Sequence, residues 1–511
     1  MNKKTKIILT VFFSLSFFLA TQKVQAANYP LEIIQPRAGL DITNRFYKAY
    51  PGLEYNVRMA VIGGLYPYIY SLTTAPSGMT INSRTGEISW LNPIINASPY
   101  NVTAQVIDSE SNIQTVSWTI TVTNSGFLFV DAVNGKSIAE GGTGKEDNPW
   151  KSMKDIYGGD DYASKSISYH PGEFVYWKTG TYYLDAYIED GTWVPFVGNY
   201  KPMVWLAYPG ENPELDFKKE PYSIAFYSNG DNRIYIDGLT IKNMTSYGIQ
   251  NNQTGTVYRR MTLYDLGPTD GFNNQSFFRL WAQGPQQNYI VIQDNMLHTL
   301  NHGAAIKVYS TTKMLIENNI IYDIIDTTGS GAIEGIALKQ DVIRPTVRGN
   351  YIYNVPNHPI GGNMNSQAVS GGQYEILYNY IKNISGNSIE LNQNSNVGSV
   401  DIYRNTLEGP INFYNTTDSA DGPFNIGENI IIHNSGSAVD TSEVLDMSRV
   451  VILDNLTGTM TDSIELEGVL QESYMEYIGS RGWQLSDGLT PMELSGSTIG
   501  APNSPTGLNV I

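Results

Sequence analysis

The feature that most constrains this chain is a repeated motif of a short hydrophobic strand, an asparagine and a second short strand. "KMLIENNIIYDI" (313–324) is hydrophobic at alternate positions and is broken by a pair of asparagines, and "QYEILYNYIKNI" (373–384) repeats the pattern. Periods of between twenty and thirty-odd residues with β patterning predict a solenoid of stacked coils. Aligning the repeats on the asparagine gives one column: Asn295, Asn319, Asn350, Asn379, Asn405, Asn429 and Asn455.

We expect this asparagine column to be structural rather than catalytic. A coil has room for three short strands, and each sharp corner needs a residue that tolerates left-handed backbone, as Asn does. The side-chain amide of each Asn can also hydrogen-bond the Asn of the next coil. Gly238 and Arg260 are predicted to hold the same corner in two earlier coils.

The first 26 residues have the pattern of a secretory signal peptide. Lys3, Lys4 and Lys6 precede an apolar run, and the segment ends in a small-x-small pattern at Ala26. The run is too short and wrongly flanked for a membrane anchor. We therefore expect a secreted protein, extracellular or periplasmic, without membrane insertion.

Charge and cysteine content limit the partners of the 511-residue chain. The formal net charge is -17, which argues against nucleic acid and anionic membrane as general partners. A local basic strip could still bind a polyanionic substrate. The chain has no cysteine, so its stability must come from packing. We expect it to act as a monomer.

Residues 27–124 are predicted to form a β-sandwich. Paired alternating strands and turns over about a hundred residues are typical of this fold. The stretch from Gly78 to Trp90, "GMTINSRTGEISW", resembles a motif of the Ig-like, cadherin-like modules of bacterial exported proteins. We expect this module to serve as a spacer or to contact carbohydrate, and a chain beginning near Gly126 to fold without it.

Residues 125–475 are predicted to form the solenoid. "FLFVDAVNGKSIAEGGTGKEDNPWKSMKDIY" (127–157) and "GEFVYWKTGTYYL" (172–184) resemble the opening of bacterial right-handed parallel β-helix proteins, with a short helix over Pro149–Tyr157. The fold class expected is therefore all-β, an Ig-like sandwich followed by a right-handed parallel β-helix. Residues 476–511 lose the repeat and are expected to form an end cap and tail.

One set of strands after the asparagines exposes side chains suited to binding acidic sugars. Alternation points the aliphatic residues of "AAIKVYS" (304–310), "GIALKQD" (335–341) and "SIELNQN" (388–394) inward and their polar residues outward. Aromatic rings stack on sugar rings, and cations pair with carboxylates. The outward residues predicted to bind or process substrate are Arg279, Trp281, Lys307, Tyr309, Lys339, Glu390, Asn392, Asn412 and Tyr414.

The loops leading into these strands add titratable candidates. His302 lies in an Asn-His-Gly turn that could be purely structural, because the Gly permits positive φ. The acidic candidates are Asp265, Asp270, Asp323, Asp326 and Glu334.

The strand "IEGIALK" (333–339) resembles the alginate lyase and chondroitinase B family, in which a glutamate calcium ligand lies five residues before the catalytic lysine. Glu334 and Lys339 would fill those positions. The chain departs from the family at Ala332, where a second acidic ligand is usual, and near 360–363, where an arginine is expected. The resemblance implies lyase chemistry and a Ca²⁺ ligand at Glu334, and Asp326 on the preceding loop is the candidate second ligand. We expect no tightly held metal, because these two carboxylates are a sparse shell for calcium.

The function predicted is β-elimination of an acidic, uronate-containing polysaccharide such as alginate. Such a lyase needs a base and a group that neutralises the uronate carboxylate. Lys339, Lys307 or His302 is the predicted base, Tyr309 the proton donor, and Arg279 or Ca²⁺ the neutralising group. Two alternatives remain: a β-helix glycoside hydrolase that pairs two of the acidic candidates, and a non-catalytic polysaccharide-binding or matrix protein.

Overall fold

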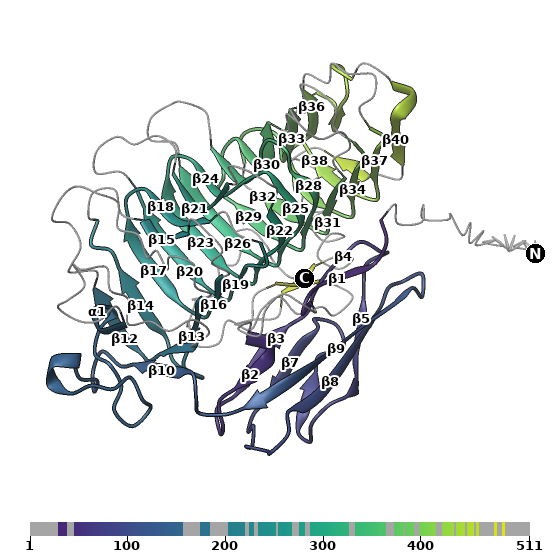
Figure 1. Ribbon diagram of the computed structural model, residues 1–511. Coiled ribbons are helices and arrows are strands. Elements are labelled where there is room, and N and C mark those ends of the chain that lie inside the picture. The colour runs from purple at the N-terminus through teal and green to yellow at the C-terminus, as the bar shows by residue number, and fades with distance from the viewer. Residues whose placement is uncertain are drawn as a thin grey trace, which may run out of the picture.

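The chain folds into an Ig-like β-sandwich that packs along one side of a right-handed parallel β-helix (Figure 1). In the part of the chain that the structure describes, no helix is long and apolar enough to cross a membrane. This computed structural model describes residues 29–37, 45–156, 174–183, 203–219, 224–228, 234–251, 254–267, 275–281, 287–325, 333–363, 373–382, 384–392, 398–414, 422–433, 436–444, 447–453, 456–458, 475–477 and 483–485.

The β-helix consists of three parallel sheets, to which successive coils add one strand each. Sheet 1 contains β10 (Phe127–Val130), β11 (Phe174–Trp177), β13 (Met203–Ala207), β16 (Ile234–Asp237), β19 (Val257–Arg259), β22 (Gln287–Gln293), β25 (Thr311–Glu317), β28 (Ile343–Arg348), β31 (Tyr374–Leu377), β34 (Val400–Tyr403), β37 (Phe424–Gly427) and β40 (Val450–Leu453). Sheet 2 contains β12 (Gly180–Tyr183), β14 (Pro213–Asp216), β17 (Thr240–Met244), β20 (Thr262–Leu266), β23 (Met296–Asn301), β26 (Ile320–Ile325), β29 (Tyr351–Tyr353), β32 (Tyr380–Lys382), β35 (Thr406–Glu408), β38 (Ile430–Ile432) and β41 (Leu456–Gly458). Sheet 3 contains β15 (Ile224–Ser228), β18 (Tyr247–Asn251), β21 (Ser276–Trp281), β24 (Ala304–Tyr309), β27 (Glu334–Leu338), β30 (His358–Asn363), β33 (Ile389–Asn392), β36 (Ile411–Tyr414) and β39 (Val439–Asp440).

The interior of the β-helix is aliphatic because every second strand residue points inward. Ile306, Ile336, Ile360 and Ile389 are in register on neighbouring strands of sheet 3, and all four are fully buried. At the first coils, Trp150 with Met153 and Ile156 of α1 (Met153–Ile156) joins the same core. The alternation read from the sequence therefore fixes which side chains of sheet 3 reach its outer face.

The asparagine column forms a continuous hydrogen-bonded ladder at the corner between sheets 1 and 2. The Nδ2 atom of Asn319 donates to Oδ1 of Asn350 at 2.9 Å, and Asn350 donates in the same way to Asn379. The left-handed residue at each corner is the one before the ladder asparagine, for example Asn318 at φ 55° and Tyr378 at φ 55°.

This geometry corrects two expectations about the corner. Gly238 at φ 83° and Arg260 at φ 49° match the left-handed position, so they align with Asp294 and not with the ladder. Met261 holds the ladder position of its coil, and its backbone N–H donates to Oδ1 of Asn295. The last member of the predicted column, Asn455, lies outside the described residues.

The Ig-like module has three small sheets. The four-stranded sheet contains β2 (Lys48–Ala49), β9 (Ile113–Val122), β8 (Tyr100–Ile107) and β5 (Ile69–Thr74). The other two contain β3 (Tyr55–Arg58), β7 (Glu87–Trp90) and β6 (Met79–Ile81), and the pair β1 (Glu32–Gln35) with β4 (Ala60–Ile62). The stretch from Gly78 to Trp90 forms the β6–β7 hairpin, in which Met79 is paired with Trp90.

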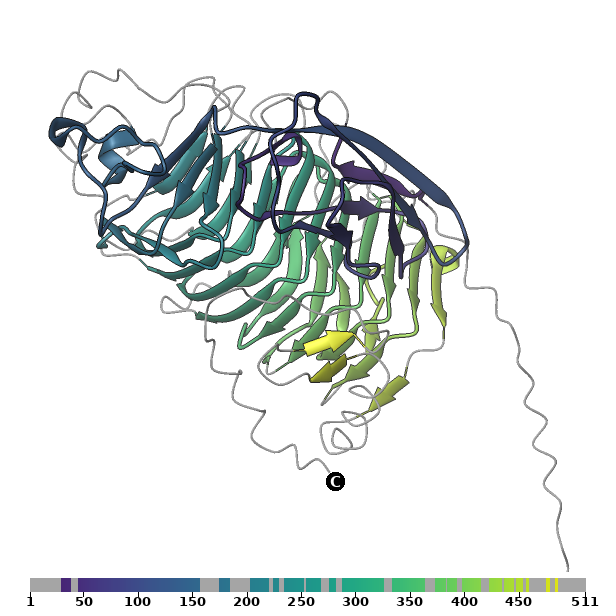
Figure 2. The same cartoon turned by 90° about the horizontal axis from the view of Figure 1, so that it is seen from below.

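The module lies against the outer face of sheet 1, as Figures 1 and 2 both show. Its core residues and the outward residues of sheet 1 form one buried apolar cluster, with Phe127, Phe174 and Tyr235 on the sheet-1 side. Farther along the sheet, Arg58 of the module pairs with Asp294 and Glu317 of the β-helix. The module is therefore an integral part of the molecule.

The ends of the chain are described only in part. The predicted signal peptide, residues 1–26, lies outside the described residues. Of the predicted cap and tail, the structure describes an antiparallel pair, β42 (Met475–Tyr477) and β43 (Trp483–Leu485).

Candidate active site

The outer face of sheet 3 carries two columns of side chains in register. The first contains Arg279, Lys307, Ala337, Gly361, Glu390, Asn412 and Asp440. The second contains Trp281 and Tyr309, then Asn392 and Tyr414 three coils farther on. The sequence-predicted strand residues thus lie on one face, and the two small residues Ala337 and Gly361 separate its cationic part from Glu390.

Lys307 is the most unusual side chain of this face. Although it points outward, it is only 6% exposed, because Arg279 and the neighbouring coils surround it. Burial lowers its pKa from 10.5 to about 8, with Lys339 and Arg279 acting in the same direction and Glu334 acting against them. The sequence had suggested an exposed lysine; the structure instead buries it, and burial is the larger cause of the lowered pKa.

Glu334 and Lys339 form an ion pair across Ala337. Glu334 begins β27, and Lys339 directly follows it. The backbone N–H of Lys339 donates to the carbonyl of Val308, which fixes Lys339 one coil beyond Tyr309. The carboxylate of Glu334 also acts electrostatically on Lys307, so both lysines share one counter-ion.

Arg279 and three aromatic residues complete the cationic part. An Nη of Arg279 donates to the Tyr247 hydroxyl at 2.7 Å, and its guanidinium lies 4.7 Å from the Tyr247 ring and 4.9 Å from the Trp281 ring. The Trp281 and Tyr309 rings lie 6.4 Å apart. Burial raises the pKa of the Tyr309 hydroxyl, so this group stays protonated and can donate a proton at neutral pH.

Sequence reasoning missed Tyr247. It opens β18, two coils before Lys307, and is in register with Ser276 at the start of the next strand. Alternation assigns to the outer face only the residues that lie between inward-facing aliphatic side chains. Tyr247 lies at the corner before the first of these aliphatic residues, so alternation does not assign it, although its side chain also points outward. Glu334 and His358 occupy the same corner position in later coils.

The other end of sheet 3 is polar and acidic. The Oε2 atom of Glu390 accepts from Asn387 at 2.6 Å and from Asn412 at 3.3 Å, and it lies 3.5 Å from Nδ1 of His358. Tyr414 is 45% exposed. This part of the face can hydrogen-bond sugar hydroxyls, and it contains no lysine or arginine on the described strands β30, β33, β36 and β39.

The described residues do not fit a calcium site at Glu334. Calcium takes six to eight oxygen ligands, whereas the Glu334 carboxylate already pairs with Lys339 and faces Lys307. Among the residues that the structure describes, no three acidic or histidine side chains are grouped so that they could hold a metal ion. The second predicted ligand, Asp326, lies outside the described residues.

The remaining candidates lie elsewhere. His302 is 2% exposed and occupies the left-handed corner between β23 and β24, at φ 76°. Asp265 and Asp323 are on sheet 2, where Asp265 pairs with Lys219 and Asp323 accepts from Asn354. Asp270 lies outside the described residues.

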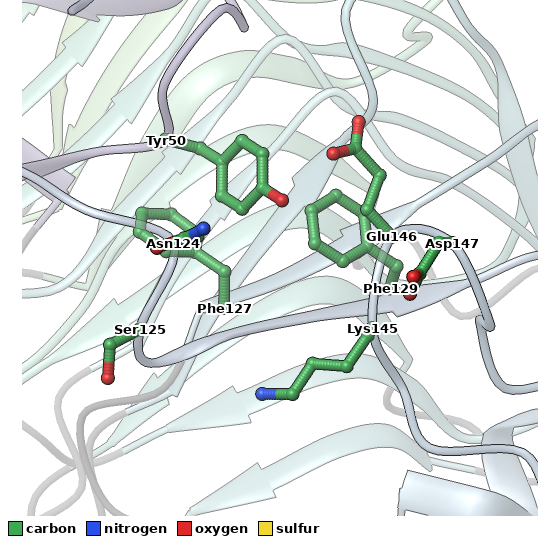
Figure 3. Close-up of a pocket in the computed structure, with 8 residues that line it drawn as sticks. All are labelled: Tyr50, Asn124, Ser125, Phe127, Phe129, Lys145, Glu146 and Asp147. Carbon is green, nitrogen blue, oxygen red and sulfur yellow. The ribbon is translucent and has the colours of Figure 1, made fainter. Parts of the chain in front are cut away.

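A cavity of about 660 Å³ lies at the junction of the Ig-like module and the first coil (Figure 3). The Tyr50 ring packs edge-on against Phe127 and Phe129, and the Glu146 carboxylate accepts from Tyr208 at 3.1 Å. Lys145 is exposed, and Figure 3 shows its ammonium pointing away from Glu146. Because this cavity has no buried cation among its lining residues, we assign the chemistry to sheet 3.

Comparison with known proteins finds a match for the first module. The family described as "Putative Ig domain" matches residues 45–123. None of the curated proteins matches the sequence. Among solved structures, the crystal structure of pectate lyase Pel9A matches at 13% identity and a TM-score of 0.30, covering 64% of this chain and 80% of that chain. The Yersinia enterocolitica family 28 exopolygalacturonase matches at 8% identity and a TM-score of 0.28, covering 81% of this chain and 97% of that chain.

Proposed function

We propose that this protein is a secreted polysaccharide lyase that cleaves a uronate-containing polysaccharide by β-elimination. The observation that carries the proposal is Lys307, a buried lysine whose pKa is lowered to about 8 beside two other cations. A general base is most effective when its pKa lies near the working pH. A lysine serving only to hold a carboxylate would need no lowered pKa.

Lys307 acts as the base in this proposal. Its neutral amine removes the proton from C5 of the uronate, the electrons of the C5–H bond form the C4–C5 double bond, and the bond from C4 to the glycosidic oxygen breaks. The resulting Lys307 ammonium is stabilised by the carboxylate of Glu334, which acts on Lys307 electrostatically. Tyr309 donates a proton to the departing oxygen, because its raised pKa keeps the hydroxyl protonated.

Lys339 and Arg279 neutralise the uronate carboxylate. This neutralisation is needed because removal of the C5 proton moves negative charge towards the carboxylate. Arg279 is suited to the role, since its Nε has no hydrogen-bond partner among the described residues while an Nη is held by Tyr247. The ion pair with Glu334 holds the Lys339 ammonium in the same region of the face.

Hydrolysis is less well supported. A glycoside hydrolase needs two carboxyl groups about 5 to 9.5 Å apart, one of which is protonated. On the described strands of sheet 3, Glu390 lies two coils from Glu334 on one side and two coils from Asp440 on the other, ~10 Å or more from backbone to backbone. Each carboxylate is also engaged, Glu334 by Lys339, Glu390 by two amide donors and Asp440 by the backbone N–H of Ser442.

The test is the ultraviolet absorbance of unsaturated uronate ends on a panel of uronate polymers. We expect absorbance to rise, and kcat/KM to increase with pH until Lys307 loses its proton near pH 8. Lys307→Met should lower turnover at least about 100-fold. Gln250→Ala, on the same column one coil before Arg279, is the control for general damage to the face. New reducing ends without unsaturation would indicate a hydrolase, and full activity in Lys307→Met would reject the assigned base.

A further inference from the structure

The lysine and arginine residues of the outer face of sheet 3 all lie towards its N-terminal coils. Arg279, Lys307 and Lys339 lie on or directly after three successive strands. Between Gln340 and Asp440 the sequence contains four lysines and arginines, and all belong to sheets 1 and 2 or their corners: Arg344, Arg348, Lys382 and Arg404. The later strands of sheet 3 and the loops directly next to them contain no lysine or arginine.

What the later coils offer instead is anionic or neutral. Glu390 and Asp440 stand in the column of Lys307, with Asn412 between them. The Asn412 amide donates to Glu390, and Tyr414 is 45% exposed beside it. Amides and carboxylates can hydrogen-bond hydroxyl groups, and an exposed aromatic ring can stack on a sugar ring.

The spacing makes this asymmetry relevant to a bound chain. Glu390 follows Lys307 by three coil steps, ~14 Å at the interstrand spacing of a sheet. A glycan lying along the column with one uronate at Lys307 would place its neighbouring residues over Gly361, Glu390 and Asn412. A carboxylate there would meet Glu390, and the described strands β30, β33, β36 and β39 carry no lysine or arginine to offset the repulsion.

We infer that the natural substrate is a heteroglycan in which the cleaved uronate is followed, towards the C-terminal coils, by uncharged sugars, and that Glu390 selects against polyuronates. This inference rests on the proposed function, because it takes Lys307 as the position of the cleaved uronate. The net charge of -17 acts in the same direction, since a uniformly charged polyanion is repelled by the rest of the surface.

The experiment compares polyuronates (alginate and polygalacturonate) with heteroglycans that carry one uronate per repeating unit, hyaluronan among them. We measure kcat/KM for unsaturated product, and Kd for oligosaccharides of both kinds on the inactive Lys307→Met variant. We expect Glu390→Lys to raise kcat/KM on polyuronates, and their affinity, about tenfold at low salt. Glu390→Gln should give a smaller gain, and neither variant should improve the heteroglycans.

Glu110→Lys is the matched control, because Glu110 is exposed on the Ig-like module and its replacement changes the net charge equally. A similar gain in Glu110→Lys, or none in Glu390→Lys, would overturn the role of Glu390. A wild-type preference for polyuronates in both kcat/KM and Kd would overturn the heteroglycan inference while leaving the lyase proposal intact. Absence of unsaturated product on every polymer would reject the lyase proposal, and the Kd values would then decide the selectivity inference alone.

Discussion

Sheets 1 and 3 both carry charged residues on their outer faces, but the two faces differ in how the basic side chains are neutralised. On sheet 1, under the Ig-like module, Arg348 pairs with Glu317 at 2.5 Å and Arg58 pairs with Asp294 and Glu317. On sheet 3, Lys307 has cations on both sides and shares the carboxylate of Glu334 with Lys339. Outward charge on a β-helix strand is therefore not in itself a sign of function.

The pKa shifts of the basic side chains differ between the two faces. Burial alone would lower the pKa of Arg58, but Asp294 and Glu317 raise it. Burial would likewise raise the pKa of Glu317, but Arg348 and Arg58 lower it. For Lys307, burial lowers the pKa and the neighbouring cations lower it further. Under the Ig-like module, carboxylates therefore keep the guanidinium of Arg58 charged, whereas on sheet 3 burial and neighbouring cations prepare Lys307 for proton transfer.

The largest expected effect is deletion of the Ig-like module. A chain beginning at Gly126 would expose Phe127, Phe129 and Phe174 and would remove Arg58, one of the two arginine partners of Asp294. Contrary to the expectation from the sequence, we predict that this chain aggregates or unfolds. Its yield as a soluble monomer, measured by size-exclusion chromatography, checks the prediction. A monodisperse product with native-like circular dichroism would contradict it.

Next in size is Arg58→Met. The substitution leaves Asp294 without its short ion pair and Glu317 with Arg348 alone, so the free energy of unfolding should fall by about 3–5 kcal/mol. Turnover of the folded fraction should not change, because the site on sheet 3 is untouched. Denaturant unfolding measures the loss. Arg84→Met, on the exposed β6–β7 turn, is the control and should be neutral.

Lys307→Met should raise the free energy of unfolding at neutral pH, whereas Arg58→Met should lower it. Because the folded-state pKa of about 8 is below 10.5, the folded protein binds fewer protons than the unfolded chain between these values, and stability rises with pH across this window. At neutral pH the buried ammonium costs the fold roughly 3 kcal/mol, which the methionine removes. Unfolding at neutral pH and near pH 10.5 should show a gain that disappears at the higher pH. A variant that is destabilised at neutral pH would show that Lys307 is not strained.

The smallest effect expected is that of Asn350→Ala. The substitution removes the hydrogen bonds from Asn350 to Asn379 and to the carbonyl of Ile316, and it removes the oxygen that accepts from the side-chain amide and the backbone N–H of Asn319. The free energy of unfolding should fall by about 1–3 kcal/mol. The kcat of the folded fraction should stay unchanged, as a thermal melt combined with a turnover assay would show. An inactive but fully folded variant would mean that the ladder has a catalytic role.

The repeat made the architecture predictable, because coil stacking is local and each coil repeats the same pattern. The orientation of Lys307, Glu390 and the other strand residues of sheet 3 followed from alternation alone. The docking of the Ig-like module did not, since Arg58 and Asp294 are 236 residues apart and neither has a local signature. The positions of the acidic candidates could not be predicted either. Asp265 and Asp323 lie on sheet 2, whose strands the sequence does not distinguish from those of sheet 3.

The Ig-like module spans the β-helix lengthwise, from Phe127 on β10 to Ser399 just before β34, which the Tyr29 hydroxyl contacts. A bare solenoid can fray from its ends, since each coil contacts only its neighbours. Because the Ig-like module contacts many coils along one side, it should make those coils unfold together. Hydrogen exchange should then be uniformly slow from β10 to β34, a stretch that contains both Lys307 and Glu390, and faster in the coils beyond it.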